Sequence, residues 1–106
     1  MIKTVIIDDD PFSQETLVDI LQDLENELKI VGIYSGVEEP LSKLPGQEVD
    51  IVFLDMELLD GQGFDVLKRL EDINFEVIIT TMHDSYMLEA IKHSAIDYLL
   101  KPILKK

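Results

Sequence analysis

Short runs of consecutive apolar residues recur along the chain, separated by longer and more polar segments. Each run is rich in β-branched or aromatic residues, and its apolar residues follow one another instead of alternating with polar ones. This pattern is typical of strands that are buried on both faces, as in a parallel sheet. The sequence therefore predicts five strands, at residues 4–7, 30–34, 51–54, 77–81 and 98–100.

The segments between these runs carry apolar residues at the spacing of an amphipathic helix. The first predicted helix covers residues 12–28, with Asp10 as its N-cap and Pro11 at its first position. Three shorter helices follow, and the last of them is expected to be capped by Asp84 or Ser85. The apolar stripes of the four helices are Leu17, Leu21, Leu24 and Leu28; Val37, Leu41 and Leu44; Phe64, Leu67 and Leu70; and Met87, Leu88, Ile91 and Ala95.

Strands and helices alternate from one end of the chain to the other, which favours an α/β domain with right-handed crossovers. For five strands we expect a flavodoxin-like, doubly wound parallel sheet in the order 2-1-3-4-5, with ligands bound at the carboxyl ends of the strands. A fifth helix should follow the fifth strand, yet the sequence ends at residues 103–106. The final helix is thus expected to be truncated. Apolar surface would then be exposed beside the first helix, and either self-association as a homodimer or marginal stability is expected.

Length and charge narrow the class of protein. The 106 residues predict one domain spanning 1–106. The net charge of −13 argues against direct binding of nucleic acid or of an anionic membrane by this chain. No apolar run approaches the roughly 20 residues of a membrane span. The N-terminus does not resemble a signal peptide and cysteine is absent, so a cytoplasmic location is expected.

Polar residues with useful chemistry stand where the predicted strands end. Residues 8–10 are three aspartates after the first strand, and Asp55 follows the third. Thr81 ends the fourth strand and Lys101 follows the fifth. Because parallel strands present their carboxyl ends at one edge of the sheet, these side chains are expected to meet there.

Carboxylates brought this close repel one another unless a cation lies between them. Mg²⁺, or Mn²⁺ in its place, suits a set of oxygen ligands that includes one or two carboxylates and several waters. We expect Asp9 and Asp55 to bind the metal directly and Asp8 to bind it through water. The backbone carbonyl of Glu57 is expected to complete the protein's share.

Such a site suits phosphoryl transfer, with Asp55 as the nucleophile. Lys101 and the hydroxyl of Thr81 would contact the remaining phosphoryl oxygens.

Each of these residues also has an ordinary structural interpretation when it is taken alone. Residues 8–10 resemble a solvated acidic turn, and Asp55 could belong to the turn at Asp60-Gly61. Thr81 could simply end a strand, and Lys101 could be a surface charge. Their occurrence together, in order, at four strand ends favours a functional site.

The order and spacing of these motifs resemble the response-regulator receiver family over essentially the whole chain. The matching stretches are residues 5–11, 52–61, 79–81 and 97–102, and the part from Thr81 to Pro102 most resembles the LytTR branch. That branch usually carries a C-terminal DNA-binding domain, which would make the output transcriptional. The resemblance implies a sensor histidine kinase as partner.

The resemblance also implies a role for individual residues. It implies an acidic pair at Asp8 and Asp9, and phosphorylation of Asp55. It further implies a switch hydroxyl at Thr81, a switch aromatic at Tyr98, a catalytic lysine at Lys101 and a cis bond between Lys101 and Pro102. From its apolar neighbours alone, Tyr98 is nearly as well explained as a buried aromatic.

Two residues depart from the family pattern. Met82 stands where a small residue is usual, and Glu57 places a carboxylate two residues past the acceptor. Both are expected to affect the kinetics of phosphorylation or hydrolysis.

Two other functions remain open. One is a Mg²⁺-dependent phosphatase similar to the haloacid-dehalogenase family. The residues after Asp10 lack the threonine or valine that is usual in that family, and the chain has no room for its common cap domain. The other is a pseudo-receiver that binds partners without phosphorylation. The receiver itself is expected to catalyse only its own phosphorylation and dephosphorylation, so it is not an enzyme in the usual sense.

Overall fold

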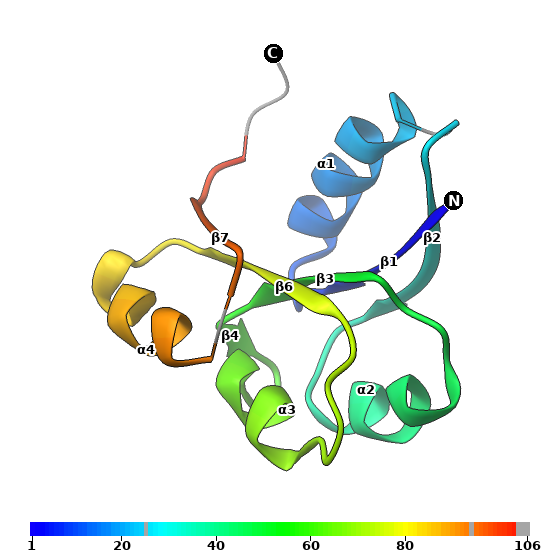
Figure 1. Cartoon of the computed structure of the whole chain (residues 1–106). Helices are drawn as coiled ribbons and strands as arrows, with labels where there is room; N and C mark the ends of the chain where they lie inside the picture. Colours follow the sequence, from blue (N-terminus) through cyan, green and yellow to red (C-terminus); the bar gives the residue numbers. More distant parts are fainter. Residues whose placement is uncertain (25, 94, 104–106) are drawn as a thin grey trace.

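Five parallel strands form the central sheet of the computed structural model, which describes residues 1–24, 26–93 and 95–103 (Figure 1). The order in space is β2-β1-β3-β6-β7, which is the predicted order 2-1-3-4-5 when the strands of this sheet are counted along the chain. The strands are β1 (Ile2–Ile7), β2 (Leu28–Tyr34), β3 (Ile51–Asp55), β6 (Glu76–Thr81) and β7 (Asp97–Leu100). The sequence did not predict a small antiparallel pair that follows β3, formed by β4 (Glu57–Leu58) and β5 (Gly61–Gln62).

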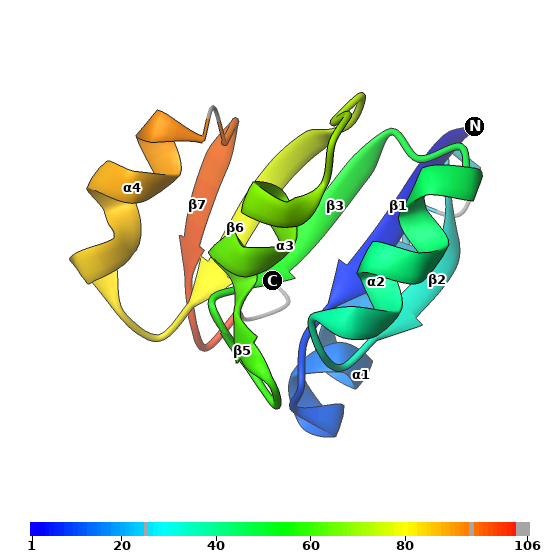
Figure 2. The same cartoon turned by 90° about the horizontal axis from the view of Figure 1, so that it is seen from below.

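Helices pack on both faces of the sheet, and the central strands β1, β3 and β6 are largely buried, as their continuous apolar runs predict. The edge strands β2 and β7 are only partly buried. Figure 2 shows α2 and α3 in front of the sheet and α1 behind it. The helices are α1 (Pro11–Gln22), α2 (Glu38–Lys43), α3 (Gly63–Arg69) and α4 (Met87–Lys92), with short 3-10 turns η1 (Leu44–Gly46) and η2 (Asp84–Tyr86).

Successive residues of a strand point to opposite faces, and this divides the core into two clusters. Val5 and Ile7 of β1 pack in the larger cluster with Phe64 of α3. Ile6 lies in the smaller cluster with Leu17 of α1.

The first helix is shorter than predicted. Asp10 does cap it, because its carboxylate accepts a hydrogen bond from the Phe12 amide at 3.1 Å. The helix nevertheless ends at Gln22, Leu24 is 43% exposed, and Leu28 begins β2. Pairing of β2 with β1 starts at Leu28 opposite Ile2, so the backbone at Leu28 is extended. The predicted apolar stripe therefore combined residues of two different elements, the helix α1 and the start of the strand β2.

The fourth helix also differs from its prediction. Its N-cap is Tyr86, with no side-chain cap, so Ser85 does not have the predicted role. The side chain of Asp84, the other predicted cap, lies outside the described part of the structure. Ala90 is the buried residue of α4, whereas three residues of the predicted stripe are exposed. They are Met87, Leu88 and Ile91. The stripe predicted the helix but not the face that packs on the sheet.

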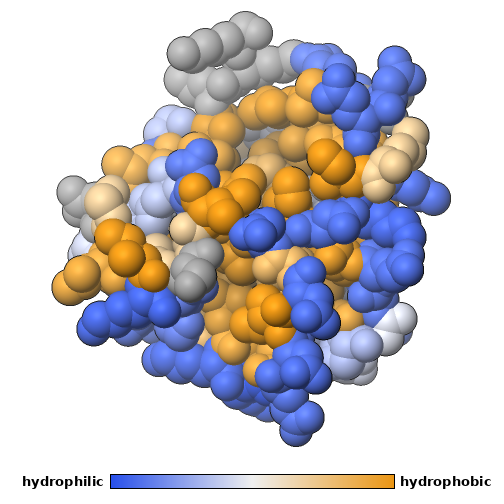
Figure 3. Space-filling view, in the orientation of Figure 1, coloured by the Kyte–Doolittle hydropathy of each residue, from blue (hydrophilic) through white to orange (hydrophobic). Residues whose placement is uncertain are grey.

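Within the described residues, α1 is the helix that packs on the face of the sheet that carries the smaller core cluster. Leu99 and Ile78 lie beside its cluster and are partly buried. Figure 3 shows hydrophobic residues gathered over the middle of the molecule between α1 and α4. The predicted truncation of the final helix concerns residues from 104 onward, which lie outside the described part of the chain. No helix among the described residues is long and apolar enough to cross a membrane.

Candidate functional site

The parallel strands bring the predicted site residues to one edge of the sheet. Asp8 follows β1, Asp55 ends β3, Thr81 ends β6, and Lys101 follows β7. The registers place Asp55 opposite Thr80, and Thr81 opposite Leu100. Residues that are far apart in sequence thus come together through the strand order alone.

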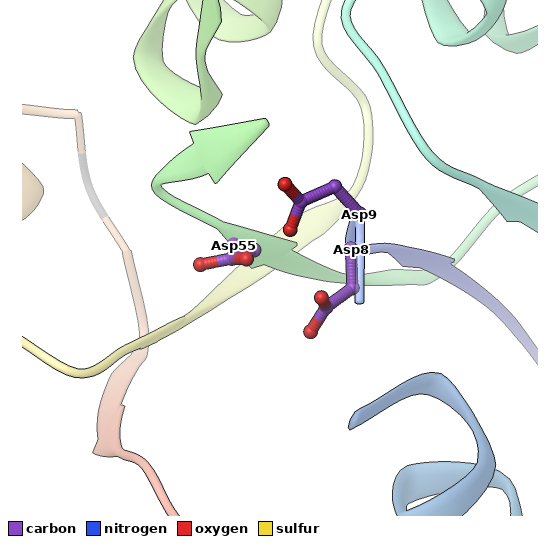
Figure 4. Close-up of side chains that lie close together, drawn as sticks. All are labelled: Asp8, Asp9 and Asp55. Atoms are coloured by element: carbon purple, nitrogen blue, oxygen red, sulfur yellow. The ribbon is translucent and has the colours of Figure 1, made fainter. Parts of the chain in front are cut away.

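Three carboxylates form the centre of the site (Figure 4). Each of Asp8, Asp9 and Asp55 offers an oxygen, and these oxygens all lie within 4.8 Å of one another. Asp8 and Asp55 are only 3% and 4% exposed, and Asp9 is partly buried. Burial and the negative charge of Asp8 raise the pKa of Asp55 to about 6, against the attraction of Lys101. The same two causes raise the pKa of Asp9.

This donor set fits a hard divalent cation such as Mg²⁺. Carboxylates whose pKa is raised by burial and by a neighbouring negative charge are stabilised when a cation lies between them. Two or three carboxylates with access to water match the ligands that Mg²⁺ and Mn²⁺ prefer. The amide of Glu57 lies 3.4 Å from Asp55 Oδ1, so Glu57 is next to the acidic cluster. Coordination by its carbonyl oxygen stays a prediction.

Lys101 brings a cation of its own into the cluster. Its Nζ lies 2.9 Å from an Asp8 carboxylate oxygen and 3.2 Å from Asp55 Oδ2. Burial alone would lower the pKa of Lys101, but the hydrogen bond to Asp8 and the attraction of Asp55 outweigh burial and raise it. The backbone positions this side chain. The Lys101 amide donates to the Thr81 carbonyl at 2.7 Å, and the bond to Pro102 is cis, as the resemblance implied.

Thr81 and Tyr98 share a neighbour, His83. Thr81 is fully buried, and its hydroxyl oxygen accepts a hydrogen bond from the His83 amide at 3.3 Å. The Tyr98 hydroxyl donates to the His83 carbonyl, while the residue packs against the larger core cluster. Tyr98 is thus partly a core residue, and its role as a switch stays a prediction.

Sequence reasoning missed several residues that support the site. Gln14 on α1 donates its side-chain amide to the Asp8 carbonyl. At Gly63 a Cβ atom would lie 2.2 Å from the Asp55 carbonyl oxygen, so only glycine lets α3 begin against the acceptor. The sequence feature that could have indicated this role is that Gly63 directly precedes Phe64, the first residue of the third apolar stripe. His83 Nε2 lies 2.8 Å from Glu57 Oε1, so this ring also reaches the loop that follows Asp55.

The acidic cluster lies apart from the larger groove found among the described residues. A groove of about 890 Å³ is lined by Leu44, Asp50 and Phe75, among others, from the loops at the amino ends of the strands. None of the three clustered aspartates lines it. The acidic cluster and this groove therefore lie at opposite ends of the sheet.

Residues 4–106 match the response regulator receiver domain family. The chain belongs to this family. The receiver is 33% identical over 102 residues to the sensory transduction protein LytR of Staphylococcus haemolyticus, which covers 94% of this chain and 40% of the relative. It is 34% identical over 104 residues to LytT of Bacillus anthracis, covering 96% of this chain and 42% of the relative. The predicted resemblance to the response-regulator receiver family, and within it to the LytTR branch, is thereby confirmed, and the curated relatives are of the LytR and LytT type.

Solved structures confirm the fold of the receiver. The response regulator domain of Thermotoga maritima CheB superposes with a TM-score of 0.84 at 25% identity, covering 96% of this chain and 79% of that one. The corresponding domain of mrkE from Klebsiella pneumoniae gives 0.86 at 24% identity, covering 97% and 85%. The receiver spans about two fifths of the length of the curated relatives described above. The family match and these relatives make it a receiver domain of two-component signalling.

Proposed function

We propose that this receiver accepts a phosphoryl group on Asp55 in a reaction that requires Mg²⁺ or Mn²⁺. The observation that carries the proposal is the contact of the Lys101 ammonium with two buried carboxylates, those of Asp8 and Asp55. The Lys101 ammonium neutralises part of the negative charge of the two carboxylates and leaves a carboxylate oxygen of Asp55 beside a positive charge. That arrangement suits stabilisation of a phosphoryl group as it arrives.

In the proposed transfer, an Asp55 carboxylate oxygen attacks the phosphorus of the donor. The new bond is an acyl phosphate, and the bond from phosphorus to the donor atom breaks, with its electron pair leaving on the donor. A metal ion held by Asp9 and Asp55, with Asp8 through water and Glu57 through its carbonyl, would supply charge neutralisation when bound. Lys101 would hold one phosphoryl oxygen and the Thr81 hydroxyl another.

The donor we propose is a phosphohistidine of a sensor histidine kinase, and a small acyl phosphate can replace it. Because the acyl phosphate carries about one more negative charge than the carboxylate, the local electrostatics change on transfer. Thr81 would move toward the phosphoryl group and Tyr98 would turn inward, changing the surface formed by α4 and β7.

An output domain would detect that surface change. The curated relatives extend well beyond the matched region, so we propose that residues 1–106 form the receiver of a longer regulator with a transcriptional output domain. A cytoplasmic location and a homodimer fit this role. The receiver would act on itself and not on external substrates.

Intact-mass spectrometry tests the proposal. The purified receiver is incubated with acetyl phosphate and Mg²⁺, and the gain of one phosphoryl group is expected. The gain should be absent in Asp55→Asn and in the presence of EDTA. Retention of the adduct in Asp55→Asn would contradict the assignment. Repeated turnover of a generic phosphate ester would indicate a phosphatase, and failure to bind Mg²⁺ would indicate a pseudo-receiver.

A further inference from the structure

A carboxylate in the loop after β3 caps a helix from a distant part of the chain. Asp60 Oδ1 accepts a hydrogen bond from the Val37 amide at 2.5 Å, and Oδ2 accepts one from the Glu38 amide at 3.3 Å. Val37 is the N-cap residue of α2, and its own side chain makes no capping hydrogen bond. The free amides at the start of α2 are therefore bound by Asp60, 23 positions beyond Val37.

A glycine leaves the space that this carboxylate occupies. A Cβ atom at Gly36 would lie 2.7 Å from Asp60 Oδ1 and 3.1 Å from its Cγ. An alanine at position 36 would therefore displace the carboxylate from the start of α2. The hydrogen bond from the Val37 amide also lowers the pKa of Asp60, so its side chain stays charged at neutral pH.

Asp60 stands at the tip of the hairpin that follows the proposed acceptor. The paired strands β4 and β5 leave Leu59 and Asp60 as the turn of this hairpin. Leu59 is 77% exposed, whereas Leu58 is 8% exposed and belongs to the larger core cluster. The core thus holds the first arm of the hairpin, and the contacts of Asp60 with α2 hold its tip.

These contacts join the loops on either side of the acidic pair. In the sheet, β1 lies between β2 and β3. Asp8 and Asp9 follow β1, the start of α2 follows β2, and Asp60 follows β3. The Glu57 amide, at the base of the same hairpin, lies 3.4 Å from Asp55 Oδ1. A change at the tip of the hairpin can therefore reach the acidic cluster through the backbone.

We propose that Asp60 is a positioning residue of the metal site, because its cap on α2 fixes the hairpin whose first residue, Glu57, is expected to offer its carbonyl to Mg²⁺. This inference rests on the proposed function, which requires the metal. A hairpin that is already held in place loses less conformational entropy when its carbonyl binds the ion, so the affinity is higher. Asp60 acts through the backbone and is not itself a ligand.

Isothermal titration calorimetry with MgCl₂ measures the effect on affinity. Asp60→Ala should raise the Kd for Mg²⁺ about threefold to tenfold, which lies within the range that a lost helix cap accounts for. Asp60→Asn removes the same charge but keeps an oxygen that accepts the amide hydrogen bonds, so its Kd should stay close to that of the unchanged chain. An unchanged Kd in Asp60→Ala, or an equal rise in Asp60→Asn, would overturn the proposal.

A second variant displaces the carboxylate without removing its charge. Gly36→Ala should raise the Kd for Mg²⁺ as Asp60→Ala does. Gly46→Ala is the matched control, because a Cβ atom there meets nothing within 4 Å. Arg69→Ala tests whether loosening α2 is enough, since it removes the 2.6 Å ion pair with Glu38 and keeps the cap. Both controls should bind Mg²⁺ normally, and a rise in Arg69→Ala equal to that in Asp60→Ala would overturn the role of Asp60.

Amide hydrogen exchange of the metal-free receiver tests the contact of the hairpin with α2 by itself. In Asp60→Ala, exchange should be faster in residues 57–62 as well as at Val37 and Glu38. Faster exchange confined to the start of α2 would show an ordinary helix cap and refute the claim about the hairpin. If the unchanged receiver binds no Mg²⁺, the proposed function fails and the claim about affinity fails with it. If it binds Mg²⁺ and the variants bind equally well, only this inference fails.

Discussion

The ammonium of Lys101 lies 2.9 Å from a carboxylate oxygen of Asp8, and the two side chains are 12% and 5% exposed. A buried ion pair of this kind contributes little net stability, but removing one partner leaves the other charge buried without compensation. Here the second acid, Asp55, lies 3.2 Å from the same ammonium. Lys101 therefore links the strand that carries the acidic pair to the strand that carries the proposed acceptor.

Replacing Lys101 should impair phosphorylation far more than folding. We expect Lys101→Ala to lower the rate of phosphorylation by acetyl phosphate about a hundredfold, because a positioned donor to the phosphoryl oxygens is lost. Lys92→Ala, which removes an exposed lysine of α4, is the control and should react normally. A normal rate in Lys101→Ala would show that this ammonium does not serve the transfer.

Mg²⁺ should stabilise the receiver through the acidic cluster. At tenfold excess over its Kd the ion should add about 1.4 kcal/mol to the free energy of unfolding, measured by urea titration. Asp9→Asn should lose most of this gain. Asp10→Asn is the matched control, since Asp10 caps α1 and is not one of the clustered carboxylates, and it should keep the gain. An equal gain in both variants would place the metal elsewhere.

The raised pKa of Asp55 predicts how stability changes with pH when no metal is bound. The pKa rises from the ordinary 3.8 to about 6 in the folded chain, so folding favours the protonated form. Protonated Asp55 contributes fully to the free energy of unfolding below about pH 3.8, and this contribution is lost as the pH rises through about 6. The full effect is on the order of 3 kcal/mol.

Asp55→Asn isolates this contribution, because it stays neutral at every pH. With EDTA present, the variant should gain stability relative to the unchanged chain as the pH rises from 4 to 7, as measured by urea unfolding. A constant difference between the two proteins over that range would rule out a raised pKa for Asp55.

Gly63 is expected to tolerate no side chain. A Cβ atom there would lie 2.2 Å from the Asp55 carbonyl oxygen and 2.6 Å from Cε of Met56. Gly63→Ala should cost about 1–3 kcal/mol of unfolding free energy and slow phosphorylation, because the acceptor backbone must shift. At Gly46 an added Cβ meets nothing within 4 Å, so Gly46→Ala is the control and should leave both quantities nearly unchanged. Equal costs at the two positions would contradict this account of the acceptor.

Much of the fold was predictable because buried parallel strands consist of uninterrupted apolar residues. The strand order then required a rule about α/β sheets, and the site followed because its residues stand at strand ends. The end of α1 was not predictable in the same way. An apolar residue such as Leu28 fits both a helical stripe and the start of a strand, and only its pairing opposite Ile2 decides.

Tertiary contacts set the other limits of prediction. The stripe of α4 indicated a helix, yet Ala90 is buried there while Leu88 is exposed, because docking determines which face turns inward. The contact of Glu57 with His83 joins distant positions, and neither residue alone signals the other. Local patterns record spacing within an element and carry no direct information about its neighbours.

Phosphorylation of Asp55 can be tested by locating the phosphoryl group chemically. Borohydride reduces an acyl phosphate of aspartate to homoserine, a stable mark that peptide mass spectrometry can assign to one residue. After treatment with acetyl phosphate and Mg²⁺, homoserine is expected at position 55 and at no other aspartate. Homoserine at position 8 or 9, or none in a chain that binds Mg²⁺, would contradict this assignment.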